Sequence, residues 1–155
     1  MYKHKIMIRG ERVVVIVGLS GVGKSTLSEQ LAKEFPEYKL IHTDEYLKYG
    51  NYGSDDALRM LQQDLREENG KVMVEGSLCY RLLRRGAENN DFIPELVIMV
   101  LATSQLRSLR RPNKNYERMD MVYRSIWKDY LGFMRMRHRQ PRIVEHVTTA
   151  EPEYS

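Results

Sequence analysis

Residues 12–26 read RVVVIVGLSGVGKST, and this segment carries the clearest signal of the fold. Its first part, 12–17, is a β-branched run that is typical of a strand buried on both faces of a parallel sheet. Residues 18–25, GLSGVGKS, follow without a gap and match the pattern GxxxxGK[ST] completely. The next residues, 24–35, carry apolar side chains four positions apart, which predicts a helix that Pro36 ends. Strand, glycine-rich loop and helix therefore come in the order that an anion-binding loop requires.

The glycine-rich loop is the strongest candidate for a functional site. Glycines let backbone N–H groups turn inward around a phosphate, and the following helix presents the positive end of its dipole to the same anion. The binding residues that the pattern predicts are Gly18, Ser20, Gly21, Val22, Gly23, Lys24, Ser25 and Thr26. We expect Lys24 to reach the β- and γ-phosphates of a nucleotide and Ser25 to hold Mg²⁺. The alternative is a tight glycine turn that carries an exposed lysine.

Strands and helices alternate along the rest of the chain. The sequence predicts further strands at 39–42, 71–75, 95–101 and 142–147, and helices at 55–69, 78–85 and about 119–134. Ser54 is expected to cap the helix at 55–69. This alternation predicts a single three-layer α/β domain over residues 1–155, with a sheet of roughly five parallel strands and helices on both faces.

The composition of the chain agrees with one globular domain. The chain has 155 residues and a net charge of +4, and no apolar run approaches the roughly 20 residues of a membrane span. No secretory signal pattern precedes the first predicted strand, so we expect a cytoplasmic location without membrane contact. One cysteine, Cys79, excludes an internal disulfide, and the four histidines lack metal-ligand spacing. We interpret these five side chains, His42 among them, as structural or surface residues.

Two carboxylates are expected where predicted strands end. Asp44 follows the strand at 39–42 in the string HTDEY, and Glu75 ends the strand at 71–75 in VMVEG. Parallel sheets bind ligands at the carboxyl ends of their strands, so both acids should face the phosphate site. Asp44 is the candidate base for a substrate hydroxyl and a further candidate metal ligand, and Glu75 is a candidate to position Mg²⁺. The alternatives are a helix cap for Asp44 and a solvated strand end for Glu75.

Other signals narrow the class of nucleotide-binding protein. The chain lacks DxxG and NKxD motifs, which argues against a GTPase, and it lacks the hydrophobic run ending in two acids that ordinary motor ATPases carry. The strings GLSGVGKST, HTDEY and VMVEG, at these separations, resemble the uridine kinase-like group of P-loop small-molecule kinases, which shares the fold of nucleoside monophosphate kinases. The resemblance covers roughly residues 12–147 and implies a P-loop NTPase fold. It also implies that the loop binds ATP, that Asp44 is the base and that Tyr46 takes the aromatic position after it.

Basic residues concentrate in the second half of the chain. Residues 103–142 hold eleven basic and three acidic side chains, a net charge of +8, which leaves the rest of the chain at −4. Arg107, Arg110 and Arg111 recur at helical spacing before a polar break, and the resemblance implies a short closing lid over about 107–118. Arg107 and Arg111 are the candidates to stabilise charge on a transferred phosphoryl group, because the arginine fork binds phosphate oxygens bidentately. The alternative is a solvated arginine face.

These observations predict an ATP- and Mg²⁺-dependent kinase that transfers the γ-phosphoryl group to a hydroxyl of a small molecule, a nucleoside or another metabolite. Tyr46, Arg81 and Arg84 are candidate substrate contacts. The first alternative is a polynucleotide 5′-hydroxyl kinase, in which the four arginines from Arg135 to Arg142 would hold nucleic acid. The second is a nucleotide-dependent switch or assembly subunit without phosphotransfer. The sequence leaves the acceptor, the base of the donor nucleotide and a homodimer open.

Overall fold

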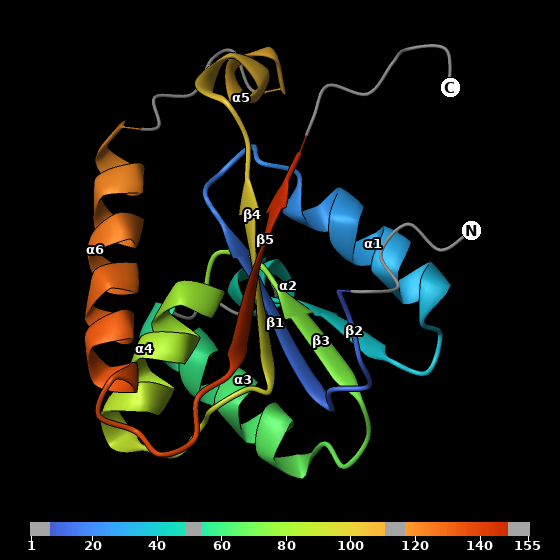
Figure 1. The fold of residues 1–155 in the computed structure, drawn as a ribbon, viewed down its shortest axis with the longest axis vertical. Helices are drawn as coiled ribbons and strands as arrows, with labels where there is room; N and C mark the ends of the chain where they lie inside the picture. The colour runs from blue at the N-terminus through green and yellow to red at the C-terminus, as the bar shows by residue number, and fades with distance from the viewer. Residues whose placement is uncertain (1–6, 49–53, 111–116, 149–155) are drawn as a thin grey trace.

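One parallel sheet forms the centre of the molecule (Figure 1). The computed structural model describes residues 7–48, 54–110 and 117–148. The strands are β1 (Val13–Gly18), β2 (Lys39–His42), β3 (Val72–Glu75), β4 (Leu96–Leu101) and β5 (Arg142–Val147). All neighbouring strands run parallel, in the order β2-β3-β1-β4-β5. The predicted five-stranded parallel sheet is confirmed.

The helices of the described ranges follow the predicted order, with one addition. They are α1 (Lys24–Glu34), α2 (Asp44–Lys48), α3 (Ser54–Glu67), α4 (Cys79–Asn89), α5 (Ser104–Arg110) and α6 (Glu117–Met134). The short helix α2 was not expected, and the acidic residues in its first turn suit the positive end of a helix. Helix α4 is longer than predicted and ends where Asn90 takes a left-handed conformation with φ of 56°. Ser54 was predicted to cap α3 and is the first residue of that helix. Its side chain lies outside the described part of the structure, so the cap stays a prediction.

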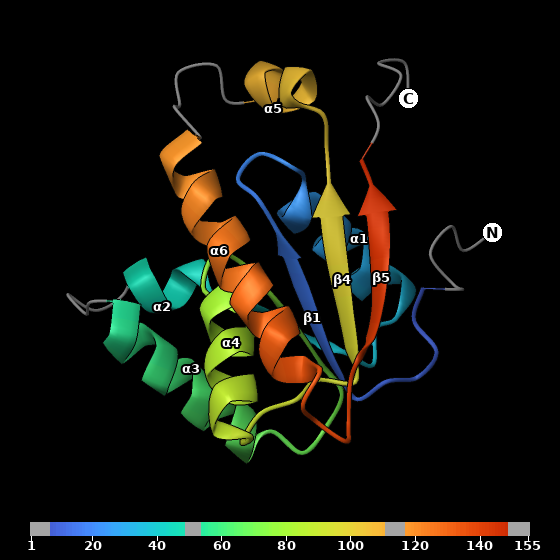
Figure 2. The same ribbon diagram turned by 60° about the vertical axis from the view of Figure 1, so that its left-hand side comes forward.

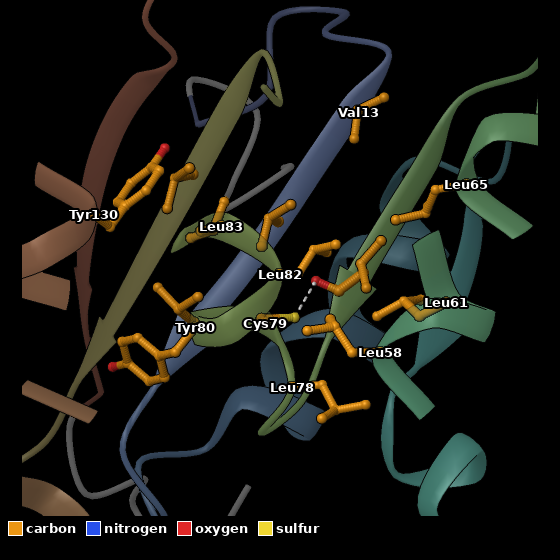
Figure 3. Close-up of a cluster of buried hydrophobic side chains, with 14 of the residues drawn as sticks. Val13, Leu58, Leu61, Leu65, Leu78, Cys79, Tyr80, Leu82, Leu83 and Tyr130 are labelled. Carbon is orange, nitrogen blue, oxygen red and sulfur yellow. Dashed lines mark hydrogen bonds between the residues drawn. The ribbon is translucent and has the colours of Figure 1, made fainter. Parts of the chain in front are cut away.

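Helices cover both faces of the sheet and bury two separate cores (Figures 1 and 2). On one face, Val14 and Ile16 of β1 pack with buried leucines of α1. On the other face, Val13, Val15 and Val17 pack with buried side chains of α3, α4 and α6. Figure 3 shows part of this second core, where the Cys79 thiol lies 3.6 Å from the Val74 carbonyl oxygen. These two cores confirm the predicted layers.

The predicted site residues lie at the edge of the sheet where the strands end, here called the carboxyl edge. Strand β3 lies between β1 and β2, and Glu75 pairs in register with Ile16 of β1 and His42 of β2. Gly18, at the start of the glycine-rich loop, pairs with Val100 of β4. Figure 2 shows α5 beyond this edge, at the opposite end of the molecule from the loop that joins α6 to β5. Among the described helices, none is long and apolar enough to cross a membrane.

Candidate active site

The glycine-rich loop joins the end of β1 to the start of α1. Gly21 and Gly23 have φ of +80° and +97°, a conformation that L side chains rarely adopt. Gly18 has a different constraint, because a Cβ there would lie 2.7 Å from Val22 Cγ2 and 2.8 Å from the Val100 carbonyl oxygen. The shape of the loop therefore requires glycine at these three positions, of which only Gly18 and Gly23 are fixed by the pattern GxxxxGK[ST].

The N-terminus of α1 directly follows this loop and is suited to binding an anion. Gly23 occupies the cap position and supplies no side-chain hydrogen bond, and the first turn contains no acidic residue. The first N–H groups of an α-helix lack acceptors within the helix, and they carry the positive end of its dipole. The predicted phosphate-binding residues Lys24, Ser25 and Thr26 supply these groups. This end of the helix fits a phosphate.

Lys24 is folded against the loop that precedes it. Its Nζ donates hydrogen bonds to the carbonyl oxygens of Gly18, at 2.7 Å, and Leu19, at 3.0 Å. Burial lowers the pKa of Lys24, while the negative charges of Glu75 and Asp44 oppose that shift. Lys24 therefore shares one electrostatic environment with both predicted carboxylates.

Glu75 lies beside the serine that was predicted to hold Mg²⁺. Ser25 Oγ is 3.4 Å from Glu75 Oε1, and His42 Nδ1 is 2.5 Å from Glu75 Oε2. Glu75 is 5% exposed, so the alternative of a solvated strand end is wrong. The sequence did not indicate that His42 contacts Glu75, because this contact depends on the register between β2 and β3.

Asp44 opens α2 at the same edge of the sheet, and its side chain is exposed. Ser77 Oγ lies 3.4 Å from Asp44 Oδ1. The pKa of Tyr123 is raised above its usual value, chiefly because the side chain is partly buried. The charge of Arg81 and a hydrogen bond with Ser77 oppose this shift, and the charge of Asp44 adds to it. Ser77 therefore contacts both Asp44 and Tyr123 of α6, and the charges of Asp44 and Arg81 act on Tyr123. Ser77 and Tyr123 were not singled out in the sequence.

The glycine after Glu75 allows the two strand ends to meet. Gly76 has φ of +137°, and a Cβ there would lie 1.9 Å from Thr43 Oγ1. Thr43 is fully buried and its N–H donates to the Glu75 carbonyl oxygen at 2.8 Å. The close approach of Thr43, the residue that precedes Asp44, therefore requires glycine directly after Glu75.

Arg107 comes from α5 and is buried against the glycine-rich loop. Its Nε donates to the Ser20 carbonyl oxygen at 2.7 Å, and its two terminal nitrogens bind the Asp120 carboxylate at 2.7 and 2.8 Å. The guanidinium reaches the glycine-rich loop, and its fork, which was predicted to bind a phosphoryl group, binds a carboxylate that the sequence did not indicate. Arg111, the other predicted lid arginine, lies outside the described residues.

The candidate substrate contacts divide into two groups. Arg81 and Arg84 line a hollow of about 530 Å³ between α3, α4 and α6. Arg84 also lies 3.6 Å from Asp129 of α6. The Tyr46 hydroxyl, in contrast, donates to Asp64 of α3, so its polar tip faces that helix. The structure brings the arginines, but not the tyrosine hydroxyl, to a cavity.

The arginines from 135 to 142 lie at the opposite end of the sheet from the glycine-rich loop. Residues 135–141 join the end of α6 to the start of β5, the edge opposite the carboxyl edge. Arg137 Nε donates to the Ala87 carbonyl oxygen at 2.9 Å, and Arg142 pairs with Glu11 at 2.7 Å. Two of the four arginines therefore have structural partners at that opposite edge.

The donor set at the carboxyl edge fits a Mg²⁺ ion that a nucleotide brings with it. Mg²⁺ prefers oxygen ligands, and in kinases it takes one or two from the protein and others from phosphates and water. The Ser25 hydroxyl and Glu75 carboxylate supply such oxygens side by side. Within the residues described, no group of three or more His, Cys, Asp or Glu could hold a metal by itself. This chain therefore offers part of a coordination shell.

Solved structures with the same fold include small-molecule kinases. Thymidylate kinase from Candida albicans matches with a TM-score of 0.52 and 16% identity, over 90% of this chain and 85% of that chain. Shikimate kinase from Acinetobacter baumannii, in complex with shikimate, matches with a TM-score of 0.54 and 15% identity, over 91% and 86%. A shikimate kinase from Bacteroides thetaiotaomicron gives a TM-score of 0.50 and 12% identity, over 85% and 83%. At these identities the likeness shows the fold alone.

The family of the chain follows from its sequence match. No curated protein matches the chain significantly. A family model described as an AAA domain matches residues 13–151, and this range includes the glycine-rich loop and both carboxylates. Because the match spans most of the chain, the protein belongs to this AAA domain family, with the P-loop NTPase fold.

Proposed function

We propose that the protein is a kinase that transfers the γ-phosphoryl group of ATP to a hydroxyl of a small molecule. The observation that carries this proposal is the convergence of one lysine and two carboxylates at the glycine-rich loop. Lys24 Nζ lies against the loop, Glu75 Oε1 lies 3.4 Å from Ser25 Oγ, and Asp44 opens α2 at the same edge of the sheet. The negative charges of both carboxylates oppose the lowering of the Lys24 pKa by burial. A phosphoryl-transfer site needs a cation for the phosphates and a carboxylate that accepts the proton of the attacking hydroxyl.

The residues of the loop would bind the triphosphate of the donor. The N–H groups at the start of α1 stabilise its negative charge, because they lack acceptors within the helix. Lys24 exchanges its hydrogen bonds to the Gly18 and Leu19 carbonyl oxygens for bonds to phosphate oxygens. Ser25 and Glu75 would hold Mg²⁺, which neutralises charge on the phosphates when it is bound.

Asp44 would orient the acceptor and take its proton. Its carboxylate is exposed at the carboxyl edge, so a substrate hydroxyl can reach it. The contact with Ser77 Oγ, at 3.4 Å, holds one carboxylate oxygen and leaves the other for the acceptor. Tyr123 hydrogen-bonds with Ser77, and the charge of Arg81 acts on Tyr123, so we propose that Tyr123 and Arg81 line the acceptor side of the site.

A screen for ATP consumption across acceptors with a free hydroxyl tests this function. Nucleosides, sugars, vitamins and short oligonucleotides with a 5′-hydroxyl are supplied with ATP and Mg²⁺. We expect transfer to at least one small molecule, and we expect Asp44→Asn to lose transfer while nucleotide binding persists. Glu45→Gln, which removes the neighbouring exposed carboxylate in the same turn of α2, is the matched control and should keep transfer.

The same screen separates the other functional classes. Transfer only to oligonucleotides, with a steep loss of binding as salt rises, would favour a polynucleotide kinase. The arginines from 135 to 142 give that function little support, because they lie at the opposite edge from Asp44. Nucleotide binding without transfer to any acceptor would favour a switch or assembly subunit. Near-normal transfer by Asp44→Asn would exclude Asp44 as the base.

A further inference from the structure

We propose that His42 is a positioning residue that orients the Glu75 carboxylate toward Ser25 and thereby sets the affinity of the site for Mg²⁺. This inference rests on the proposed function only in that the P-loop binds a nucleotide with its metal. His42 ends β2 and pairs in register with Glu75 on the neighbouring strand. The two side chains are thus fixed by backbone pairing before any ligand binds.

The two oxygens of Glu75 have different partners. Oε1 is 3.4 Å from Ser25 Oγ, on the loop side, and Oε2 is 2.5 Å from His42 Nδ1, on the β2 side. Glu75 in its ionised form has acceptors only, so the proton of this bond belongs to His42 Nδ1. While the imidazole holds Oε2, rotation of the carboxylate would break that bond. Oε1 is therefore kept available beside the serine hydroxyl.

Burial makes this hydrogen bond important for the carboxylate. Glu75 is 5% exposed, so water reaches it poorly, and a buried acceptor that loses its donor carries a large desolvation penalty. Lys24 lies close enough for its charge to interact with Glu75. Without His42, we expect the carboxylate to turn toward Lys24 and away from Ser25. The metal site would then lose its arranged oxygen pair.

The other side of the imidazole has a weaker neighbour. His42 Nε2 lies 4.0 Å from Glu29 Oε1 of α1, a distance too long for a hydrogen bond. The Glu29 side chain is 64% exposed. The contribution of His42 to the site therefore depends on the hydrogen bond from its Nδ1 to Glu75. Glu29 is an acidic residue near the same imidazole without such a bond, so its substitution serves as a control.

A comparison of His42→Asn with His42→Gln tests the role of Nδ1. The asparagine amide nitrogen lies as many bonds from Cα as Nδ1, whereas the glutamine amide nitrogen corresponds to Nε2. Mn²⁺ affinity is measured on the ADP-loaded protein by titration calorimetry or by electron paramagnetic resonance, and metal-free ADP affinity is measured alongside. Removal of a residue that orients a metal ligand typically costs about 10- to 100-fold in metal affinity.

We expect His42→Gln and His42→Leu to weaken Mn²⁺ binding by about 10-fold or more, and His42→Asn to stay within about 3-fold of the wild type. Metal-free ADP affinity should be unchanged in all three variants, and Glu29→Gln should behave as the wild type. Where transfer is observed, the concentration of Mg²⁺ needed for half-maximal rate should rise while the rate at saturating Mg²⁺ is largely kept.

Two results would overturn the proposal. Unchanged Mn²⁺ affinity in a folded His42→Leu or His42→Gln protein would show that Glu75 does not need the histidine. Equal losses of Mn²⁺ affinity in the asparagine and glutamine variants would assign His42 to packing alone. The metal measurement requires no acceptor, so a chain that binds Mn²⁺ as expected but transfers no phosphoryl group would refute the kinase function and leave the role of His42 intact.

Discussion

Arg107 of α5 and Asp120 of α6 form a bidentate ion pair that is buried beside the glycine-rich loop. The pair joins α5 to α6, the two helices in which the predicted lid at about 107–118 begins and ends. The bond from Arg107 Nε to the Ser20 carbonyl oxygen extends this link to the loop itself. Through this one side chain, α5 and α6 are both fastened to the glycine-rich loop.

Removing one partner of this ion pair should destabilise the protein strongly. Asp120→Ala leaves the Arg107 charge buried, and we expect a loss of about 3–5 kcal/mol in the free energy of unfolding, measured by urea denaturation. Asp129→Ala is the matched control, because solvent reaches both partners of its pair with Arg84, and that pair should contribute less than about 1 kcal/mol. Equal effects of the two substitutions would contradict a structural role for the buried pair.

Glycine at position 76 should be far less replaceable than glycine at position 132. Gly76→Ala places a Cβ 1.9 Å from Thr43 Oγ1 at a φ of +137°, so we expect a loss of at least about 2 kcal/mol in unfolding free energy. Gly132→Ala lies within α6 where a Cβ meets nothing within 4 Å, and it should stabilise the protein by about 0.5–1 kcal/mol. Thermal unfolding of both variants checks the difference in sign.

Lys24→Met should reduce transfer and raise stability together. Loss of the phosphate-binding cation is expected to lower the rate about 10²- to 10³-fold. Because burial lowers the pKa of Lys24 below its ordinary 10.5, the folded state binds this proton less well than the unfolded state. The charged lysine therefore costs stability at neutral pH, and this cost disappears as pH rises through the lowered pKa toward 10.5.

The stability difference between Lys24→Met and the wild type should follow the same pH dependence. We expect the variant to be more stable at neutral pH and its advantage to shrink at alkaline pH, as measured by chemical denaturation across pH. An advantage that stays constant over this range would show that the hydrogen bonds of Lys24, rather than its charge, decide the effect.

Arg137 should matter for stability but not for transfer. Its guanidinium binds the carbonyl oxygens of Ala87 and Glu88 at the end of α4, so Arg137→Met is expected to cost about 1.5 kcal/mol. Arg139, an exposed neighbour in the same loop, supplies the control, and Arg139→Met should leave stability within about 0.5 kcal/mol of the wild type. Assays of transfer to the identified acceptor should give wild-type rates for both variants, whereas a loss with Arg139→Met would implicate this loop in the reaction.

The fold was predictable from the sequence because its signals are local. A β-branched run, a glycine-rich loop and an amphipathic helix follow one another in residues 12–35, and each later strand is bounded by its own turn signals. The short helix α2 was missed because five residues are too few to show a helical period.

The site was predictable only in part, because several of its contacts join residues far apart in sequence. The glycine-rich loop, Asp44 and Glu75 could be predicted from motifs at strand ends. The contact between His42 and Glu75 depends on the register of two strands, and Arg107 with Asp120 depends on the approach of two helices. Neither contact produces a periodic pattern in the sequence. Charge and spacing therefore suggested that Arg107 binds phosphate but did not indicate that it pairs with Asp120.

The pairing of β2 with β3 has a further consequence for the stability of the site. Each of these strands is four residues long, and their ladder ends with the bond from the Thr43 N–H to the Glu75 carbonyl oxygen. A slip of one residue would turn either His42 or Glu75 to the other face of the sheet. The exchange rate of the Thr43 amide hydrogen would therefore report when this corner opens, and each opening would separate His42 from Glu75 at the proposed metal site.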